Sequence, residues 1–193
     1  MNEIVSELKN PLTKEYLEFK RIIFETEDFP WFFSSDTTGI KSDKYFFYYH
    51  AILMRGNPPT IASQGIYGGC KLIVEQILDY NGIELNDIFR MSLNSTHYYP
   101  FKYNNPHVDH HYSHSNMLIY LNNCHGDTIV FKEKYKKDYD DNCWAPANKN
   151  KFHIKNRIKP KEDKIVSFDG SHFHCHSFPK PDERRVVFVC TYN

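Results

Sequence analysis

The chain has 193 residues, enough for one domain with a full hydrophobic core, and its 16% aromatic content argues against disorder. Lys and Arg number 24 and are balanced by 24 Asp and Glu, so the positive excess expected of a nucleic-acid-binding protein is absent. Five cysteines without a C-x-x-C pair argue against a zinc ribbon or disulfide framework and predict a reducing, cytoplasmic location. The sequence has neither a run of eighteen apolar residues nor an N-terminal signal pattern, so no membrane association is expected.

Residues 1–87 are predicted to be helical or irregular. Thr13 can cap a first helix, whose apolar face is formed by Tyr16, Phe19 and Ile23 and which must stop before Pro30. A second helix is predicted over 70–80, after a flexible glycine-rich stretch, with a C-cap at Asn81-Gly82. Its predicted apolar face consists of Leu72, Ile73, Gln76, Ile77 and Tyr80.

Residues 88–193 are predicted to form short strands separated by turns, without intervening helices. This pattern is typical of a jelly-roll or double-stranded β-helix barrel. The Lys- and Asp-rich stretch from 132 to 151 is predicted to be a solvated loop over the barrel mouth. The expected strands are 89–95, 106–110, 117–122, 127–132, 152–158, 164–168, 172–177 and 184–191.

His107-Val108-Asp109 is the motif that points most directly to chemistry. On a strand, residues i and i+2 project to the same face, so an imidazole and a carboxylate would lie side by side. A second imidazole from a distant strand would complete a 2-His-1-carboxylate facial triad. Such a triad leaves three metal positions open and is the usual environment of non-haem Fe(II) oxygenases.

The third ligand must be chosen among the histidines of the strand at 172–177. His172, His174 and His176 are all in phase there, so periodicity alone does not separate them. The neighbourhood favours His174, which follows the apolar strand and tight turn ending at Gly170 and precedes the basic pair Arg184-Arg185.

At this point the chain resembles the small 2-oxoglutarate/Fe(II)-dependent dioxygenases of the prolyl-4-hydroxylase-like type that are common in phage and bacterial genomes. The matching stretches lie in the expected order and span most of the chain. They are Phe29-Pro30-Trp31, Pro106-His107-Val108-Asp109, Ile119-Tyr120-Leu121-Asn122, the segments 126–131 and 166–170, His174 with Pro179, and the segment 184–187.

The resemblance implies a mainly β, double-stranded β-helix barrel of the jelly-roll or cupin-like kind, with the N-terminal helices packed on its outside. The whole chain, 1–193, would be a single domain in which residues 1–87 support a barrel core formed by 88–193. It also implies Fe(II) bound by His107, Asp109 and His174, with 2-oxoglutarate and O2 as co-substrates.

The basic pair fits the co-substrate that this resemblance implies. The C5 carboxylate of 2-oxoglutarate would be buried in the barrel, and a guanidinium offers it a bidentate, charge-assisted partner. Arg184 and Arg185 are adjacent on a strand, so only one can point inward. The side chains in phase with Arg185 leave more room, which favours Arg185; Arg184 would then be a surface charge.

Several further residues are weaker candidates. Tyr120 could donate a hydrogen bond to the co-substrate carboxylate, or be an ordinary core tyrosine. Asn94 is expected either to line the site or to be a buried structural amide. Three histidines after the metal pair, His110, His111 and His114, are predicted to lie at the rim rather than to bind metal.

Two other functions use the same His/Asp/His site. One is a cupin-like zinc or other metalloenzyme, because His and carboxylate ligands also suit Zn²⁺; the other is a non-catalytic metal- or sugar-binding barrel. The arginine after the third ligand favours the oxygenase, because hydrolytic zinc chemistry needs no buried carboxylate partner. The expected partner is a small-molecule or peptide substrate contacted by the loops 34–44, 96–105 and 132–151, and its identity and the oligomeric state are not encoded in any motif.

Overall fold

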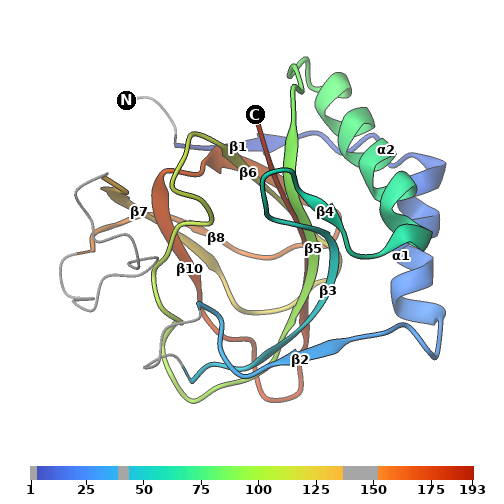
Figure 1. The fold of residues 1–193 in the computed structure, drawn as a ribbon. Helices are drawn as coiled ribbons and strands as arrows, with labels where there is room; N and C mark the ends of the chain where they lie inside the picture. The colour runs from blue at the N-terminus through green and yellow to red at the C-terminus, as the bar shows by residue number, and fades with distance from the viewer. Residues whose placement is uncertain (1–3, 39–43, 137–151) are drawn as a thin grey trace.

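The protein, seen here as a computed structural model, is described over residues 4–38, 44–136 and 152–193. Two antiparallel sheets face each other, and two helices cover the outer side of the larger sheet (Figure 1). The predicted mainly β architecture with N-terminal helices outside is confirmed. In chain order the elements are β1 (Val5–Leu8), α1 (Lys14–Glu25), β2 (Phe32–Ser34), β3 (Phe47–Met54), β4 (Thr60–Ile61), α2 (Gln64–Tyr80), β5 (Ile88–Thr96), β6 (Ser115–Tyr120), β7 (Thr128–Lys134), β8 (Ile154–Ile158), β9 (Ile165–Asp169), β10 (His172–His176) and β11 (Arg185–Tyr192).

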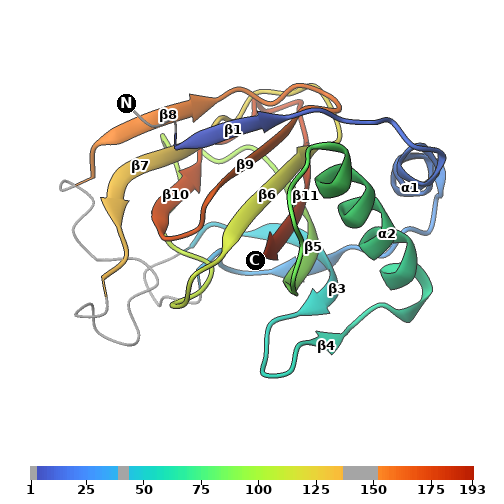
Figure 2. The same ribbon diagram turned by 90° about the horizontal axis from the view of Figure 1, so that it is seen from above.

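The larger sheet has the strand order β1-β9-β6-β11-β5-β3-β2, with β4 paired to β3, and the smaller sheet has the order β10-β7-β8. Seen from above, the strands of the two sheets lie face to face (Figure 2). The central strand β11 is buried along its whole length. Its residues alternate between Val186 and Phe188, which face the helices, and Val187 and Val189, which face the space between the sheets.

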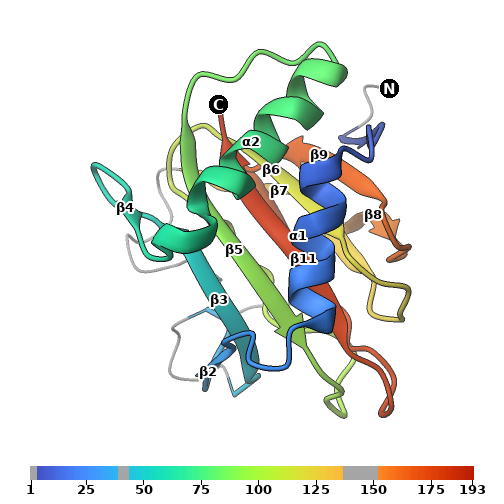
Figure 3. The ribbon, with the colours of Figure 1, turned by 90° about the vertical axis from the view of Figure 1, so that its right-hand side faces the viewer.

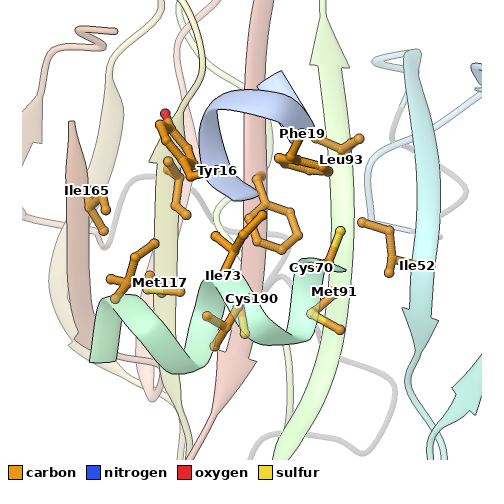
Figure 4. Packing of buried hydrophobic residues seen from close by; sticks show 14 of the residues in the cluster. Tyr16, Phe19, Ile52, Cys70, Ile73, Met91, Leu93, Met117, Ile165 and Cys190 are labelled. Atoms are coloured by element: carbon orange, nitrogen blue, oxygen red, sulfur yellow. The ribbon is translucent and has the colours of Figure 1, made fainter. Parts of the chain in front are cut away.

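The helices lie across the outer face of the larger sheet, over β11 and β5 (Figure 3). The Thr13 hydroxyl accepts a hydrogen bond from the backbone N–H of Tyr16 and begins α1, as predicted. The predicted apolar face of α1 is also confirmed, because Tyr16, Phe19 and Ile23 are all buried. Phe19 meets Phe188 of β11 edge to face, with ring centroids 5.4 Å apart. Figure 4 shows this core between helices and sheet.

Helix α2 differs from its prediction at its start and in its buried face. It begins at Gln64, so the glycines expected to precede the helix lie within its first turns. The predicted face included Leu72 and Tyr80, which are 41% and 60% exposed. The side chains that are buried instead are Cys70, Ile73, Val74, Ile77 and Leu78. The predicted C-cap is confirmed, because Asn81 ends the helix and Gly82 adopts a positive φ of 66°.

Residues 1–87 contain strands that the sequence did not predict. β1 pairs with β9, and β3 pairs with β5, so both extend the larger sheet. β3 has the sequence FYYHAILM, an apolar and aromatic run with one polar residue, His50, and without the period-2 alternation that marks a half-buried strand. The alternation is absent because both faces of β3 are in contact with the protein. One face packs in the core beneath α2, and the other lines the interior of the barrel.

Seven of the eight strands predicted after residue 88 are confirmed, but the one expected over 106–110 is wrong. His107 makes an isolated bridge to His174, and the chain bends at Asp109. Beyond this bridge His176 bonds to Asn104, through the Asn104 backbone N–H and side-chain Oδ1, so the regular ladder does not continue. Asn104 N donates to His176 O at 3.0 Å, His176 N donates to Asn104 Oδ1 at 2.8 Å, and the backbones of His107 and His174 bond in both directions at 2.9 Å.

No helix in the described ranges is long and apolar enough to cross a membrane. The four cysteines that the structure describes are buried free thiols, namely Cys70, Cys124, Cys175 and Cys190. The predicted loop over 132–151 begins later than expected because β7 continues to Lys134, and its residues 137–151 lie outside the described part of the chain.

Candidate metal centre

A cavity of about 550 Å³ lies between the two sheets. Its walls come from β3, β5, β10 and β11 and from the segment that carries His107 and Asp109. Predicted site residues on its wall are Asn94, His107, Asp109, His174, His176 and Arg185. The structure therefore brings the predicted metal ligands and one of the two candidate arginines into one cavity.

His107, Asp109 and His174 are close enough to share one ion. One ligand atom from each can be chosen so that all three lie within 4.8 Å of one another. The imidazole rings of His107 and His174 have centroids 4.6 Å apart, and Nε2 of His174 lies 3.2 Å from Oδ2 of Asp109. Although the predicted strand is absent, the paired backbones of His107 and His174 bring the two rings together.

Both imidazoles are oriented as metal ligands usually are. Nδ1 of His107 lies 2.9 Å from the carbonyl oxygen of Asn105, and Nδ1 of His174 lies 3.3 Å from that of His172. With a cation bound, each Nδ1–H can donate to its carbonyl while the Nε2 lone pair binds the cation. Burial lowers the pKa of His107 to about 4, so this imidazole is neutral near pH 7. These donor atoms fit a divalent cation of the iron or zinc type.

Asp109 is the anionic member of the group. Burial would raise the pKa of this carboxyl, but the hydrogen bond with His174 and the charges of Arg90 and Arg55 together hold it well below its usual range. Oδ1 lies 3.0 Å from Nη1 of Arg90 and 3.2 Å from Nη2 of Arg55. Asp109 is therefore a buried, ionised carboxylate at neutral pH.

Arg185 lies inside the barrel and Arg184 outside it. The Arg185 side chain is buried, and its Nε and Nη2 donate to the carbonyl oxygen of Gly126 and to Oγ1 of Thr128, both at 2.8 Å. Among the described residues, no carboxylate lies within ion-pair distance of its guanidinium. The guanidinium of Arg184 instead lies over the rings of Phe24 and Trp31 on the helix side.

Position 126, next to Arg185, requires a glycine for both its backbone conformation and the space available. Its φ of 99° lies in the region that other residues rarely adopt. A Cβ at this position would lie 2.9 Å from the carbonyl oxygen of Ser177 and 3.1 Å from Cδ of Arg185. A side chain here would therefore clash with the Ser177 carbonyl and crowd the Arg185 side chain.

Tyr120 is buried behind the cavity wall, next to Arg185. Its ring centroid lies 5.5 Å from the guanidinium carbon, and its hydroxyl donates to Oγ1 of Thr128 at 2.7 Å. Thr128 lines the cavity and accepts from both Tyr120 and Arg185, so its own hydroxyl hydrogen is available to a ligand. The effect of Tyr120 on a bound ligand would thus pass through Thr128.

The other histidines considered in the sequence analysis lie in different environments. Nδ1 of His172 faces the carbonyl oxygen of Phe131 (2.8 Å), and Nε2 of His110 faces the hydroxyl of Thr191 (2.8 Å). His111 stacks on Tyr135, with ring centroids 4.8 Å apart. His114 is buried against Gly170, where a Cβ would overlap the imidazole. Of these, none belongs to the cavity wall among the described residues, unlike His176.

Thr128, Arg55 and Arg90 are among the cavity residues that the sequence analysis missed. Thr128 lies in the segment 126–131, which was noted only for its resemblance. Arg55 and Arg90 come from the end of β3 and from β5, and no local pattern marks them, because their common position depends on the pairing of those two strands.

No protein-family model matches the chain, and no curated protein sequence matches it either. Solved structures do match. An oxidoreductase of the 2OG-Fe(II) oxygenase family from Burkholderia pseudomallei has a TM-score of 0.68 at 14% identity, covering 98% of this chain and 85% of the other. A non-haem α-ketoglutarate-dependent carbocyclase from nogalamycin biosynthesis has a TM-score of 0.65 at 12% identity, with coverage of 98% and 79%.

A prolyl hydroxylase from Trichoplax adhaerens, in complex with a peptide of hypoxia inducible factor, has a TM-score of 0.55 at 13% identity. That match covers 98% of this chain and 83% of the hydroxylase. At these identities the feature shared with all three proteins is the fold. The chain therefore has the double-stranded β-helix fold of the 2-oxoglutarate oxygenases, as predicted.

Proposed function

We propose that this protein is an Fe(II)- and 2-oxoglutarate-dependent oxygenase that hydroxylates a substrate at a C–H bond. His107, Asp109 and His174 would hold the iron, and the fold shared with 2-oxoglutarate oxygenases supports this role. When bound together, Fe(II) and 2-oxoglutarate supply O2 activation, with succinate and CO2 as co-products.

The proposal depends mainly on the environment of the Arg185 side chain. This buried guanidinium faces the cavity, and its described hydrogen-bond partners are neutral oxygen atoms. A buried charge is costly unless an opposite charge compensates it. A dicarboxylate that reaches the metal with one end and Arg185 with the other would supply that charge.

The residues around Arg185 would orient such a co-substrate. Gly126 and Thr128 fix two of the five guanidinium N–H donors, so the planar fork is held in one direction. The Thr128 hydroxyl can add a hydrogen bond to the same carboxylate. Val187 and Val189 add apolar lining to the same cavity, and apolar surroundings strengthen the attraction between a guanidinium and a carboxylate.

The other two functions of a His/Asp/His barrel remain as alternatives. A hydrolytic zinc enzyme or a non-catalytic metal-binding barrel would use the three ligands equally well. Neither of them accounts for a buried guanidinium aimed into the same cavity. The prime substrate in this proposal is a small molecule or a peptide.

Anaerobic titration of the Fe(II)-loaded protein with 2-oxoglutarate tests the proposal. A weak visible charge-transfer band should develop, because a keto acid can occupy two of the three positions that a facial triad leaves open. Calorimetry should give a saturable heat of binding in the same titration. Absence of both the band and the heat would contradict the oxygenase and favour the metallohydrolase.

The Asp109→Ala variant is the matching test of the site. It removes the anionic ligand, so Fe(II) affinity should fall by well over tenfold. Mutation of groups that only orient the ligands already lowers metal affinity by about 10–100-fold. Replacement of His172, outside the cavity wall, should leave Fe(II) affinity nearly unchanged. Unchanged affinity in both His107→Ala and Asp109→Ala would show that the metal binds elsewhere.

A further inference from the structure

Asn104 lies where the segment that carries His107 meets β10. Its side chain is buried, and it lines the cavity. The Asn104 backbone N–H donates to the carbonyl oxygen of His176, and the Asn104 side-chain Oδ1 accepts from the backbone N–H of His176. One residue therefore makes both of the hydrogen bonds that a paired strand would make to His176, one through its backbone and one through its side chain.

The orientation of the Asn104 amide follows from the groups on its two sides. A backbone N–H can only donate, so the amide atom that faces His176 must be the oxygen. The amide nitrogen donates to Oγ1 of Thr37 at 3.3 Å. Thr37 follows β2 and lines the same cavity. The amide is thus held at both ends, with its oxygen directed at β10.

The amide oxygen of Asn104 takes a place that a regular ladder gives to a backbone carbonyl. His107 and His174 exchange two hydrogen bonds. In an antiparallel ladder the next such pair lies two residues further along each strand, which here would be Asn105 with His176. The partner of His176 is Asn104 instead, so the segment has one extra residue opposite β10, as in a β-bulge.

The Asn105 carbonyl, displaced from that place in the ladder, meets the imidazole of His107. Its oxygen lies 2.9 Å from Nδ1 of His107. Because a carbonyl oxygen only accepts, this contact places the proton of the neutral ring on Nδ1. Nε2 is then the nitrogen that can bind a cation, whereas the other tautomer would carry a proton there.

We propose that Asn104 is a positioning residue for the metal ligand His107. By bonding to the His176 N–H, the Asn104 Oδ1 leaves the Asn105 carbonyl to fix the His107 ring with its proton on Nδ1. This inference rests on the proposed function, in which His107 binds iron. The role requires no contact between Asn104 and the metal.

Loss of the amide oxygen should disturb this arrangement. In Asn104→Leu, which keeps a side chain of similar size, the N–H of His176 loses its acceptor, and a buried backbone N–H needs one. The carbonyl of Asn105 is the acceptor that a regular ladder offers, so it would be drawn away from Nδ1 of His107. The His107 ring should then populate both tautomers and bind metal less tightly.

The tautomer of His107 can be measured in metal-free protein that carries ¹⁵N-labelled histidine. Two-bond ¹H–¹⁵N NMR spectra distinguish a protonated ring nitrogen from an unprotonated one, and the His107 signals are identified by their absence in His107→Gln. In the wild type at pH 7 we expect one tautomer, protonated at Nδ1. Anaerobic titration with Fe(II) then gives the metal affinity of the same samples.

Three variants of Asn104 separate its oxygen from its bulk. Asn104→Leu should give a mixture of His107 tautomers and an Fe(II) affinity lower by about 10–100-fold, as for other groups that orient metal ligands. Asn104→Ala removes the same oxygen and replaces the leucine variant if that variant does not fold. Asn104→Asp keeps an acceptor for the His176 N–H, so it should retain the single wild-type tautomer.

Asn122→Leu is the matched control. The Asn122 amide also bonds to a strand backbone in both directions, donating to the carbonyl oxygen of Arg184 at 2.7 Å and accepting from the N–H of Val186 at 3.0 Å. Asn122 is not among the described residues that line the cavity. Its replacement should leave both the His107 tautomer and the Fe(II) affinity unchanged.

Three results would overturn this role. The first is a wild-type His107 that is protonated at Nε2 or is a mixture of tautomers, a result that needs no variant. The second is an Asn104→Leu protein with the wild-type tautomer and the wild-type Fe(II) affinity, which would make Asn104 a structural residue only. The third is an equal change in Asn122→Leu, which would indicate a general loosening of the barrel. Failure of the wild type to bind Fe(II) counts against the proposed function instead, because the tautomer is measured without metal.

Discussion

Arg184 and Arg185 are neighbours in the sequence but have opposite environments. The guanidinium carbon of Arg184 lies 5.5 Å from the ring centroid of Phe24 and 5.7 Å from that of Trp31, outside the barrel. Arg185 is buried inside it, on Gly126 and Thr128. Because successive strand residues point to opposite faces, the two positions form a matched pair for mutation.

Arg185→Ala should weaken 2-oxoglutarate binding by roughly tenfold to several hundredfold. A charge-assisted hydrogen bond is typically worth ~1.5–3 kcal/mol, at ~1.4 kcal/mol per decade, and the variant also strands a buried carboxylate. Fe(II) affinity should stay near normal, because Arg185 is not a ligand. Anaerobic calorimetry with 2-oxoglutarate gives the affinity directly.

Two further variants complete that comparison. Arg184→Ala should leave 2-oxoglutarate affinity unchanged and cost about 0.5–1 kcal/mol of stability, as expected for cation–π contacts at a partly exposed site. Arg185→Lys should restore binding only in part, since it lacks the planar fork. If Arg184→Ala had the large effect on binding, the proposed co-substrate position would be wrong.

Residues that act through their chemical type and spacing could be identified from the sequence. His107, Asp109 and His174 were found because an imidazole and a carboxylate two residues apart, with a distant imidazole, suit one ion. Arg55 and Arg90 carry no such spacing. Their guanidiniums meet on Asp109 only because β3 and β5 are neighbours in the sheet, and β3 itself was not predicted.

Helix α2 shows where hydrophobic periodicity becomes ambiguous. Apolar residues occupy nearly every side of the helix between 70 and 80, so more than one face satisfies the 3.6-residue period. Contact with the sheet determines which of these helix faces is buried. Ile73 is buried against it at 1% exposure, whereas the adjacent Leu72 is 41% exposed. Glycines in the first turns did not prevent the helix, because packing overrides intrinsic propensity.

Ile73→Ala should therefore lower the free energy of unfolding by about 2–5 kcal/mol, because it leaves a cavity between α2 and the sheet. Leu72→Ala should change it by no more than about 0.5 kcal/mol, as for most exposed positions. Urea denaturation followed by circular dichroism measures both. Equal losses in the two variants would mean that α2 packs on the sheet through a different face.

The cavity is built from segments that lie far apart in the chain. Order and spacing of the strands after residue 88 sufficed to predict the barrel, because alternating short strands and turns are local signals. The wall contributed by β3 could not be predicted in this way. Its residues Tyr49, Ala51 and Leu53 line the cavity through their pairing with β5, a contact between distant parts of the sequence.

Burial in the folded protein keeps several histidines neutral. Burial lowers the pKa of His107 to about 4 and the pKa values of His110 and His176 to about 3. In the unfolded chain each would titrate near 6.5. Between pH 6.5 and about 4 the unfolded state therefore binds more protons than the folded state, so stability rises with pH in that window.

We accordingly expect the metal-free protein to lose stability as the pH falls from 7 to 5, before most carboxylates titrate. Each histidine can contribute up to ~1.4 kcal/mol per pH unit below 6.5, and the three together several kcal/mol. Urea denaturation with a chelator at pH 7, 6 and 5 measures the slope. His110→Asn, which removes one titrating group outside the candidate metal ligands, should make the slope shallower by about one proton. A free energy of unfolding that stays constant from pH 7 to 5 would show that these imidazoles are not held neutral by burial.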